Sequence, residues 1–232
     1  GSPHDKALAE AFGDLGALEG ALPGYATSRI LTFAVLKTET KAEGVQSSRV
    51  LPAAEVRSMQ AALHVAMNRT TEAEAAILEA RANDAASPAS YDAEGLLADR
   101  ARDEARALRA YVRAAELGST SRHSYYRAAQ LAWKPQLDPE ALQAIRRHLE
   151  QAIELDGKYA QPHACLAEIL AELGKAEAAR TSAETAISLE PGRSHHRLIL
   201  GRVLLSLDRS DEAREAGRLG LQLAEDAGAR AD

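Results

Sequence analysis

A pattern of alanine and other small residues recurs about every 34 residues through most of this 232-residue chain. The five copies begin at Ala54, Pro88, Arg122, Ala160 and Ser194, so successive starts lie 34, 34, 38 and 34 residues apart. A helical unit of this length cannot bury its own apolar face, and copies therefore stack to share one continuous core. The period predicts a solenoid, whose usual role is to present an extended groove to a partner rather than to run a reaction.

The copy from Ala160 to Arg193 has small and apolar residues at helical spacing on both sides of Gly174. These residues are Leu166, Ala167, Leu170, Ala179, Ala183 and Ala186. Gly174 marks a tight turn between two helices, and Pro191–Gly192 ends the second helix. Small residues are expected where the two antiparallel helices cross, because a larger side chain would force the helices apart.

The other four copies place comparable residues at the same positions. They are Ala61, Ala73, Ile77 and Ala80 in the first copy, Tyr91, Gly95, Ala107, Tyr111 and Ala114 in the second, Tyr125, Ala129, Leu149 and Ala152 in the third, and Leu200, Gly201, Leu204, Ala213, Gly217 and Gly220 in the last. The third copy has about four extra residues in its turn, where Asp138 is predicted to cap the second helix and Pro139 to be its first residue. In the first copy, Thr71 and Glu74 have the spacing of a capping box.

This pattern closely resembles the tetratricopeptide repeat, whose motif pairs a bulky residue and a Gly or Ala in the first helix with alanines in the second helix and a proline after it. The resemblance covers about residues 54–227 and implies an all-α fold, a right-handed α-α superhelix. The implied repeats are 54–87, 88–121, 122–159, 160–193 and 194–227, with a tail at 228–232.

Three features depart from the repeat motif. Glu94 stands where an apolar residue is expected, Ile145 stands where a small residue is expected, and the turn after Asp99 lacks glycine. These departures affect the expected local geometry rather than the architecture. The alternative fold is an irregular, alanine-rich helical bundle.

Residues 1–53 follow a different pattern. A helix is predicted from Asp5 to Leu22, and short strands are predicted at Arg29–Lys37 and Val45–Leu51. This small α/β segment is expected to be a cap for the solenoid or the remnant of a preceding domain. The leading Gly1–Ser2 is typical of a cloning scar, which leaves open whether a targeting signal preceded it.

The same N-terminal segment loosely resembles the end of a gluzincin-type zinc peptidase domain that precedes helical repeats in some bacterial proteins. The peptidase motif His-Glu-x-x-His is missing here, so no activity can be transferred. The resemblance implies an alternative function, in which the repeats are accessory to a zinc peptidase whose catalytic domain is absent from this sequence.

Charge and hydropathy reduce the classes of partner that the chain is expected to bind. The formal charge of −6 disfavours a nucleic-acid ligand, and no apolar run approaches the ~18–20 residues of a membrane helix. The single cysteine, Cys165, excludes an intramolecular disulfide but leaves the compartment open. We expect a soluble protein, cytoplasmic or, if a native signal was removed, periplasmic or secreted.

No motif in the chain predicts catalysis, a cofactor or a metal site. His195 and His196 are adjacent and so point to different sides of a helix, and neither has a partner four residues away. Cys165 has no histidine fixed beside it by the sequence. The acidic pair Asp103–Glu104 begins a second helix, where it interacts favourably with the helix dipole. We therefore expect that the chain is not an enzyme.

A concave groove is the better candidate for a binding site. In tetratricopeptide repeats this surface is lined by fixed positions of the first helices, and the resemblance implies that a protein or peptide ligand binds there. The implied groove residues are Asp99, Arg100, His123, Tyr126, Gln130, Trp133, Lys134, Glu168, His195 and Arg202.

Tyr126 and Trp133 are seven residues apart, about two helical turns, so both face the same side. Trp133 is either an anchor for a peptide or a residue packed beneath the inserted turn. Ser58, Ala62 and Val65 in the first copy differ from the set with which chaperone-binding relatives clamp a C-terminal carboxylate, and that partner class is disfavoured.

The last helix is predicted to expose apolar surface. Leu219, Leu221 and Leu223, together with Gly217 and Gly220, are expected to be only partly covered. Either further protein follows in the native chain, or the chain forms a homodimer through this C-terminal helix.

Overall fold

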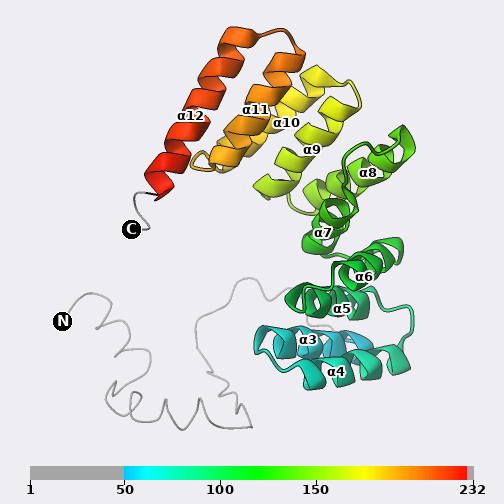
Figure 1. Ribbon diagram of the computed structural model, residues 1–232. Helices are drawn as coiled ribbons and strands as arrows, with labels where there is room; N and C mark the ends of the chain where they lie inside the picture. The colour runs from blue at the N-terminus through cyan, green and yellow to red at the C-terminus, as the bar shows by residue number, and fades with distance from the viewer. Residues whose placement is uncertain (1–49, 229–232) are drawn as a thin grey trace, which may run out of the picture. The chain divides into compact units, whose positions relative to one another are not determined.

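The computed structural model describes residues 50–228, which form a succession of α-helices joined by short loops (Figure 1). The helices are α3 (Ala53–Ala66), α4 (Thr70–Asn83), α5 (Pro88–Arg100), α6 (Glu104–Glu116), α7 (Arg122–Ala132), α8 (Pro139–Leu155), α9 (Ala160–Glu172), α10 (Ala176–Leu189), α11 (Ser194–Ser206) and α12 (Ser210–Gly228). Residues 50–228 contain no strand. The helix and strands predicted before residue 50 lie outside the described residues, apart from Val50 and Leu51, which are not in a strand.

Consecutive helices pair into hairpins, and consecutive hairpins stack. Within the stack, α3 packs on α4, α5 on α6, α7 on α8, α9 on α10 and α11 on α12. Each later first helix also contacts the hairpin before it, as α11 contacts both α9 and α10. Figure 1 shows this order along the described chain. The all-α solenoid predicted from the sequence period is therefore confirmed.

Small residues lie at the points where the helices of a hairpin cross. Ala167 on α9 and Ala179 on α10 are both fully buried, as the pattern predicted. In the second hairpin the small residue is Gly95, and the facing residue on α6 is Tyr111. A Cβ atom on Gly95 would overlap the ring of Tyr111, which is fully buried and donates a hydrogen bond to Asp99 Oδ2 at 2.8 Å. Moving the Tyr111 ring aside would break this hydrogen bond and disturb the packing around it.

We predict that Gly95→Ala lowers the free energy of unfolding by about 1–3 kcal/mol, because the added methyl group overpacks the interface with Tyr111. Gly217→Ala is the matched change, since it lies inside α12 and an added Cβ there would meet no atom within 4 Å. That substitution should stabilise the chain by up to about 1 kcal/mol, because alanine loses less backbone entropy in a helix. Urea denaturation of both variants measures the two effects, and equal effects would contradict the overlap at Gly95.

The turns inside the hairpins share one backbone conformation. Four of them contain a residue in the left-handed region, Asn68 (φ 59°), Arg102 (φ 58°), Gly174 (φ 71°) and Asp208 (φ 58°). In each of these turns the next backbone N–H donates to a carbonyl five residues back, as from Lys175 to Leu170 at 2.8 Å. This is the Schellman arrangement that ends many helices. The turn after Asp99 therefore closes without glycine, because Arg102 adopts the required conformation.

Of the two helix caps predicted from the sequence, the one at α8 is observed and the one at α4 is not. Asp138 caps α8 by accepting a hydrogen bond from the Ala141 backbone N–H at 2.8 Å, and Pro139 is the first residue of the helix, as predicted. The capping box predicted at Thr71 and Glu74 is wrong. Helix α4 already begins at Thr70, so Thr71 lies within the first turn and its side chain does not cap the helix.

Glu94 is held by two arginines from neighbouring helices. Its carboxylate accepts hydrogen bonds from Arg81 of α4 at 2.5 Å and from Arg106 of α6 at 2.9 Å. Arg106 also lies 3.6 Å from Glu74 of α4. Burial alone would raise the pKa of Glu94, but the two guanidinium groups outweigh it and the pKa lies below its usual value. A charged residue occupies this position because it links three helices.

We predict that Glu94→Gln lowers the free energy of unfolding by about 1–3 kcal/mol at pH 7, because two charge-assisted hydrogen bonds are weakened. The Glu94 pKa is lower in the folded chain than in the unfolded chain. Its charge therefore stabilises the fold above the unfolded value, about pH 4.3, and this contribution is lost as the pH falls through the folded pKa.

Urea denaturation at pH 7 and pH 3 tests this, and the difference between wild type and Glu94→Gln should shrink at pH 3. Glu116→Gln is the control, since Glu116 forms an exposed pair with Arg113 and should contribute little at either pH. A difference that persists unchanged at pH 3 would mean that the charge of Glu94 is not responsible.

Candidate functional site

A pocket of about 300 Å³ lies between α7, α9 and the start of α11. Its buried lining is mainly apolar and comes from α7, α8 and α9, namely Ala129, Ile145, Leu149, Ala164 and Ile169, with the buried His196 added from the start of α11. Its more exposed lining is mainly polar or aromatic, namely Tyr126, Gln130, Trp133, Gln161, Glu168, Arg193 and His195. The pocket therefore combines an apolar interior with an opening that carries hydrogen-bonding groups, the usual composition of a ligand site.

Half of the predicted groove residues line this pocket. They are Tyr126, Gln130, Trp133, Glu168 and His195. Two more lie beside it. Arg202 of α11 forms an ion pair with Glu168 of α9, and Lys134 directly follows Trp133. Lys134 is exposed and makes no hydrogen bond or ion pair with any residue in the described range.

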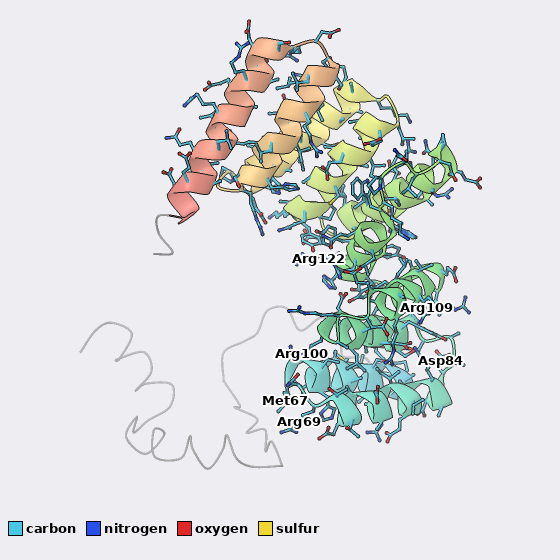
Figure 2. The ribbon with its side chains drawn as sticks, viewed as in Figure 1. Met67, Arg69, Asp84, Arg100, Arg109 and Arg122 are labelled. Carbon is cyan, nitrogen blue, oxygen red and sulfur yellow. The ribbon has the colours of Figure 1, made fainter. Side chains whose placement is uncertain are left out.

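The other three predicted groove residues do not line the pocket. Asp99 is engaged by Arg127 Nε at 2.8 Å and by the Tyr111 hydroxyl, so its carboxylate joins α5, α6 and α7. His123 packs edge-on against the Tyr111 ring, with centroids 5.9 Å apart. Arg100, labelled at the end of α5 in Figure 2, donates from Nε to Asn68 Oδ1 at 3.0 Å. These side chains are held in contacts between neighbouring helices.

Trp133 stands at the opening of the pocket. It is the C-cap residue of α7, and its backbone N–H donates to the Ala129 carbonyl at 3.1 Å. Its side chain lines the pocket and the residue is 43% exposed, so the inserted turn does not cover it. A half-exposed indole beside a preformed hollow offers a large contact area at a small cost in side-chain entropy.

Aromatic rings support the wall of the pocket at Tyr126. The Tyr126 and Tyr159 rings meet edge to face, with centroids 5.3 Å apart. The guanidinium of Arg122 lies 5.0 Å from the centroid of the Tyr159 ring and also pairs with Asp156. Figure 2 labels Arg122 at the start of α7. Burial raises the pKa of Tyr126, so the hydroxyl stays protonated and can donate.

Cys165 of α9 also lines the pocket, beside Tyr126. Burial raises the pKa of its thiol to about 11, and a hydrogen bond from the Tyr126 hydroxyl only partly opposes this. Almost all of the thiol is therefore protonated at neutral pH, which makes it a weak nucleophile.

Comparison of the sequence with protein-family models and with curated proteins gave no significant match. Solved structures are similar in fold. YrrB, described as a TPR protein with an unusual peptide-binding site, matches with a TM-score of 0.62 and 16% identity over 73% of this chain and 86% of that chain. A MamA structure matches with a TM-score of 0.59 and 19% identity over 75% of this chain and 94% of that chain. MamA 41-end from Desulfovibrio magneticus RS-1 matches with a TM-score of 0.58 and 15% identity over 77% of this chain and 98% of that chain.

The chain has the tetratricopeptide-repeat fold. Solenoids of this type present extended surfaces built from the first helices of successive hairpins. The pocket follows that scheme in part, since α7, α9 and α11 are all first helices.

Part of the pocket comes from residues that the tetratricopeptide-repeat pattern did not predict as ligand-facing. Ile145 and Leu149 belong to α8, a second helix, and Arg193 precedes α11. Ile145 gave one signal in the sequence, because it is larger than the residue expected at its position. Arg193 gave no such signal in the sequence, since its side chain is positioned by a contact with Glu190.

The described part of the chain gives two further observations. Among residues 50–228, no helix combines the length and the apolar character that crossing a bilayer needs. In the same range, no three or more His, Cys, Asp and Glu side chains are grouped so that they could hold a metal ion.

We predict that Cys165 in the folded chain reacts with a thiol reagent such as DTNB at least ten-fold more slowly at pH 8 than in the urea-unfolded chain. At a pKa of about 11 only about 0.1% of the thiol is ionised at pH 8, against about a quarter at the ordinary value, and higher intrinsic nucleophilicity offsets only part of this difference. Because Cys165 is the sole cysteine, the absorbance change reports it alone. Equal rates in the two states would show that the thiol is neither buried nor shifted.

Proposed function

We propose that this chain is a non-catalytic scaffold for protein–protein interaction, which binds a peptide segment in the pocket between α7, α9 and α11. The observation that carries the proposal is the apolar hollow with the half-exposed Trp133 at its opening. A hollow of about 300 Å³ suits one large apolar or aromatic side chain of a peptide, while the helices around it offer contacts to the neighbouring residues. The tetratricopeptide-repeat fold supports this role, since proteins of this fold are typically scaffolds.

Oriented amide groups at the opening support recognition of a peptide backbone. Gln130 Oε1 accepts from Arg127 Nη1 at 2.5 Å, which directs the amide nitrogen of Gln130 away from that arginine. Gln161 Nε2 donates to Glu190 Oε1 at 3.1 Å, so this side chain is also held in place. Side chains fixed before binding lose less entropy when a ligand arrives.

The charges around the pocket favour an apolar anchor over a strongly charged one. Arg202 pairs with Glu168, and Arg193 Nε donates to Glu190 Oε2 at 2.9 Å. These paired charges nearly cancel one another, so the free energy of binding should come chiefly from apolar contact and hydrogen bonds, with a smaller electrostatic contribution from Lys134 beside the pocket. Binding should accordingly depend only weakly on salt concentration.

The similarity to YrrB is consistent with this proposal, because that protein is described as having a peptide-binding site. At 16% identity the similarity concerns the fold, and the ligand of this chain is identified by the experiment below. The alternative drawn from the sequence, a repeat region accessory to a zinc peptidase, depends on residues before Val50 and on sequence outside this chain.

We predict that peptides selected from a random-sequence library against the whole chain bind at the pocket. Trp133 is the sole tryptophan, so binding should change its fluorescence directly. The double change Trp133→Ala, Lys134→Ala should raise the dissociation constant at least ten-fold. Calorimetry measures this variant, because its fluorescent residue is lost. Leu78→Ala is the control, since Leu78 is an exposed apolar residue of α4 outside the pocket, and its affinity should equal that of wild type.

Two outcomes would contradict the proposal. In the first, the selected peptides bind the double variant as tightly as wild type, which places the site elsewhere. In the second, a saturating peptide leaves the Cys165 reaction rate with DTNB unchanged, although an occupant of the pocket must cover that thiol further. Agreement between the two measurements distinguishes loss of the site from a general loss of structure.

A further inference from the structure

Helix α3 carries a stripe of exposed apolar side chains. The stripe, called here the α3 stripe, consists of Val56, Met59, Leu63 and Met67. Their spacing of three and four residues places Val56, Met59 and Leu63 on one face of the helix, and Met67 follows as its C-cap residue. Met59 is 59% exposed and Leu63 is 53% exposed, and the stripe includes both methionines of the chain. Figure 2 labels Met67 where α3 turns into α4.

The corresponding face of α11 is buried. The first and fifth sequence copies start 140 residues apart, so Met59 corresponds to Ile199 and Leu63 to Val203. Ile199 and Val203 are each 1% exposed and belong to the core cluster formed with α7–α10. The same two positions are therefore almost completely covered in one first helix and open in the other.

Helices α5 and α9 bury residues of this face as well, whereas on α7 the corresponding Arg127 and Leu131 are only partly buried. On α5 the corresponding residues are Ala93 and Leu97, which pack in a cluster with residues of α3 and α4. On α9 the residue corresponding to Leu63 is Ile169, which packs in the cluster that includes Leu149 of α8. This face is thus the one by which a first helix stacks onto the preceding hairpin, and the α3 stripe has the chemistry of such a face.

The opposite end of the stack has the complementary surface. A shallow groove between α11 and α12, called here the α11–α12 groove, has small and apolar lining at Leu198, Gly201, Leu205, Ala213 and Gly217. Its polar lining consists of Arg202, Ser210 and Arg214. Leu198 is 39% exposed and Leu205 is 58% exposed. One repeat earlier, the residues corresponding to Leu198 and Gly217 are Ala164 and Ala183, which are both buried within the cluster that includes α11 residues.

Inside the described chain, a first helix packs against the preceding hairpin at four places, α4 with α5, α6 with α7, α8 with α9 and α10 with α11. The α3 stripe is one half of such an interface, and the α11–α12 groove is the other half. We propose that the two halves join between molecules, so that the α3 stripe of one copy packs into the α11–α12 groove of a second copy and continues the stack.

This contact uses different surfaces on the two partners. A head-to-tail contact leaves one free α3 stripe and one free α11–α12 groove on every assembly, so that further copies can add. The protein should therefore form a growing series of species rather than stopping at a symmetric dimer. No residue lines both the α11–α12 groove and the pocket between α7, α9 and α11, although Arg202 of the groove pairs with Glu168 of the pocket. The α3 stripe makes no part of the pocket, so a substitution there tests assembly separately from peptide binding.

The test uses full-length chains with one end blocked. Leu63→Lys places a charge in the α3 stripe, and Leu205→Lys places one in the α11–α12 groove. Both leucines are more than half exposed, so the fold should survive, which circular dichroism checks. Leu78→Lys is the matched control, because the residues corresponding to Leu78 on α10 and α12, Glu184 and Arg218, are exposed and polar.

Light scattering and sedimentation should show that the mean mass of wild type and of Leu78→Lys rises with concentration beyond that of a dimer. Leu63→Lys and Leu205→Lys should each remain monomeric when studied alone. Mixed in equal amounts, they should form a dimer and nothing larger, because the first keeps an intact α11–α12 groove and the second keeps an intact α3 stripe. Trp133→Ala should assemble like wild type.

Several results would overturn the proposal. A wild type that is monomeric at all concentrations would mean that the α3 stripe is covered by another segment of the same chain or serves a different partner. Self-association of Leu63→Lys alone would show a symmetric contact between α11–α12 grooves. A mixture of the two blocked variants that stays monomeric would exclude head-to-tail pairing directly.

Discussion

The close approach of two helices at a small residue is the contact on which the rest of this structure depends. Alanines such as Ala167 and Ala179 let the backbones of a hairpin come together, and their complete burial leaves no room for a longer side chain. Where the second hairpin uses a large residue, Tyr111, the facing residue shrinks to Gly95. The sum of the two facing volumes sets the spacing of the helices, and the spacing sets how the next hairpin can stack.

The pocket lies where this rule is relaxed. At the corresponding crossing position the other four hairpins have Ala73, Ala107, Ala179 and Ala213, whereas the third has Ile145. Ile145 is buried and lines the pocket, next to Leu149 from the following turn of α8. The third hairpin also has the longer turn after Trp133. One departure supplies apolar lining and the other leaves an aromatic ring at the opening, so the irregular hairpin is also the one with the best candidate site.

The sequence could predict what depends on local spacing. The alanines at the crossings and the Asp138 cap depend on a few neighbouring residues, and both were predicted correctly. It could not predict which side chains become engaged across hairpins. Asp99 has the sequence position of a groove residue, yet Arg127, 28 residues later, holds its carboxylate. Likewise Thr71 and Glu74 fit a capping motif, but the helix begins too early for the motif to operate.

The hairpin turns have a consequence for how such a surface can vary. Their shape is held by backbone hydrogen bonds, and residues as different as Asn68, Arg102, Gly174 and Asp208 occupy the same left-handed position. Apart from Asn68, which accepts a hydrogen bond from Arg100 of the next hairpin, the side chains at this position are therefore largely decoupled from the pitch of the stack. Mutation can alter the chemistry of one margin of the protein, in charge or in bulk, while the interhelical geometry that shapes the pocket is inherited unchanged.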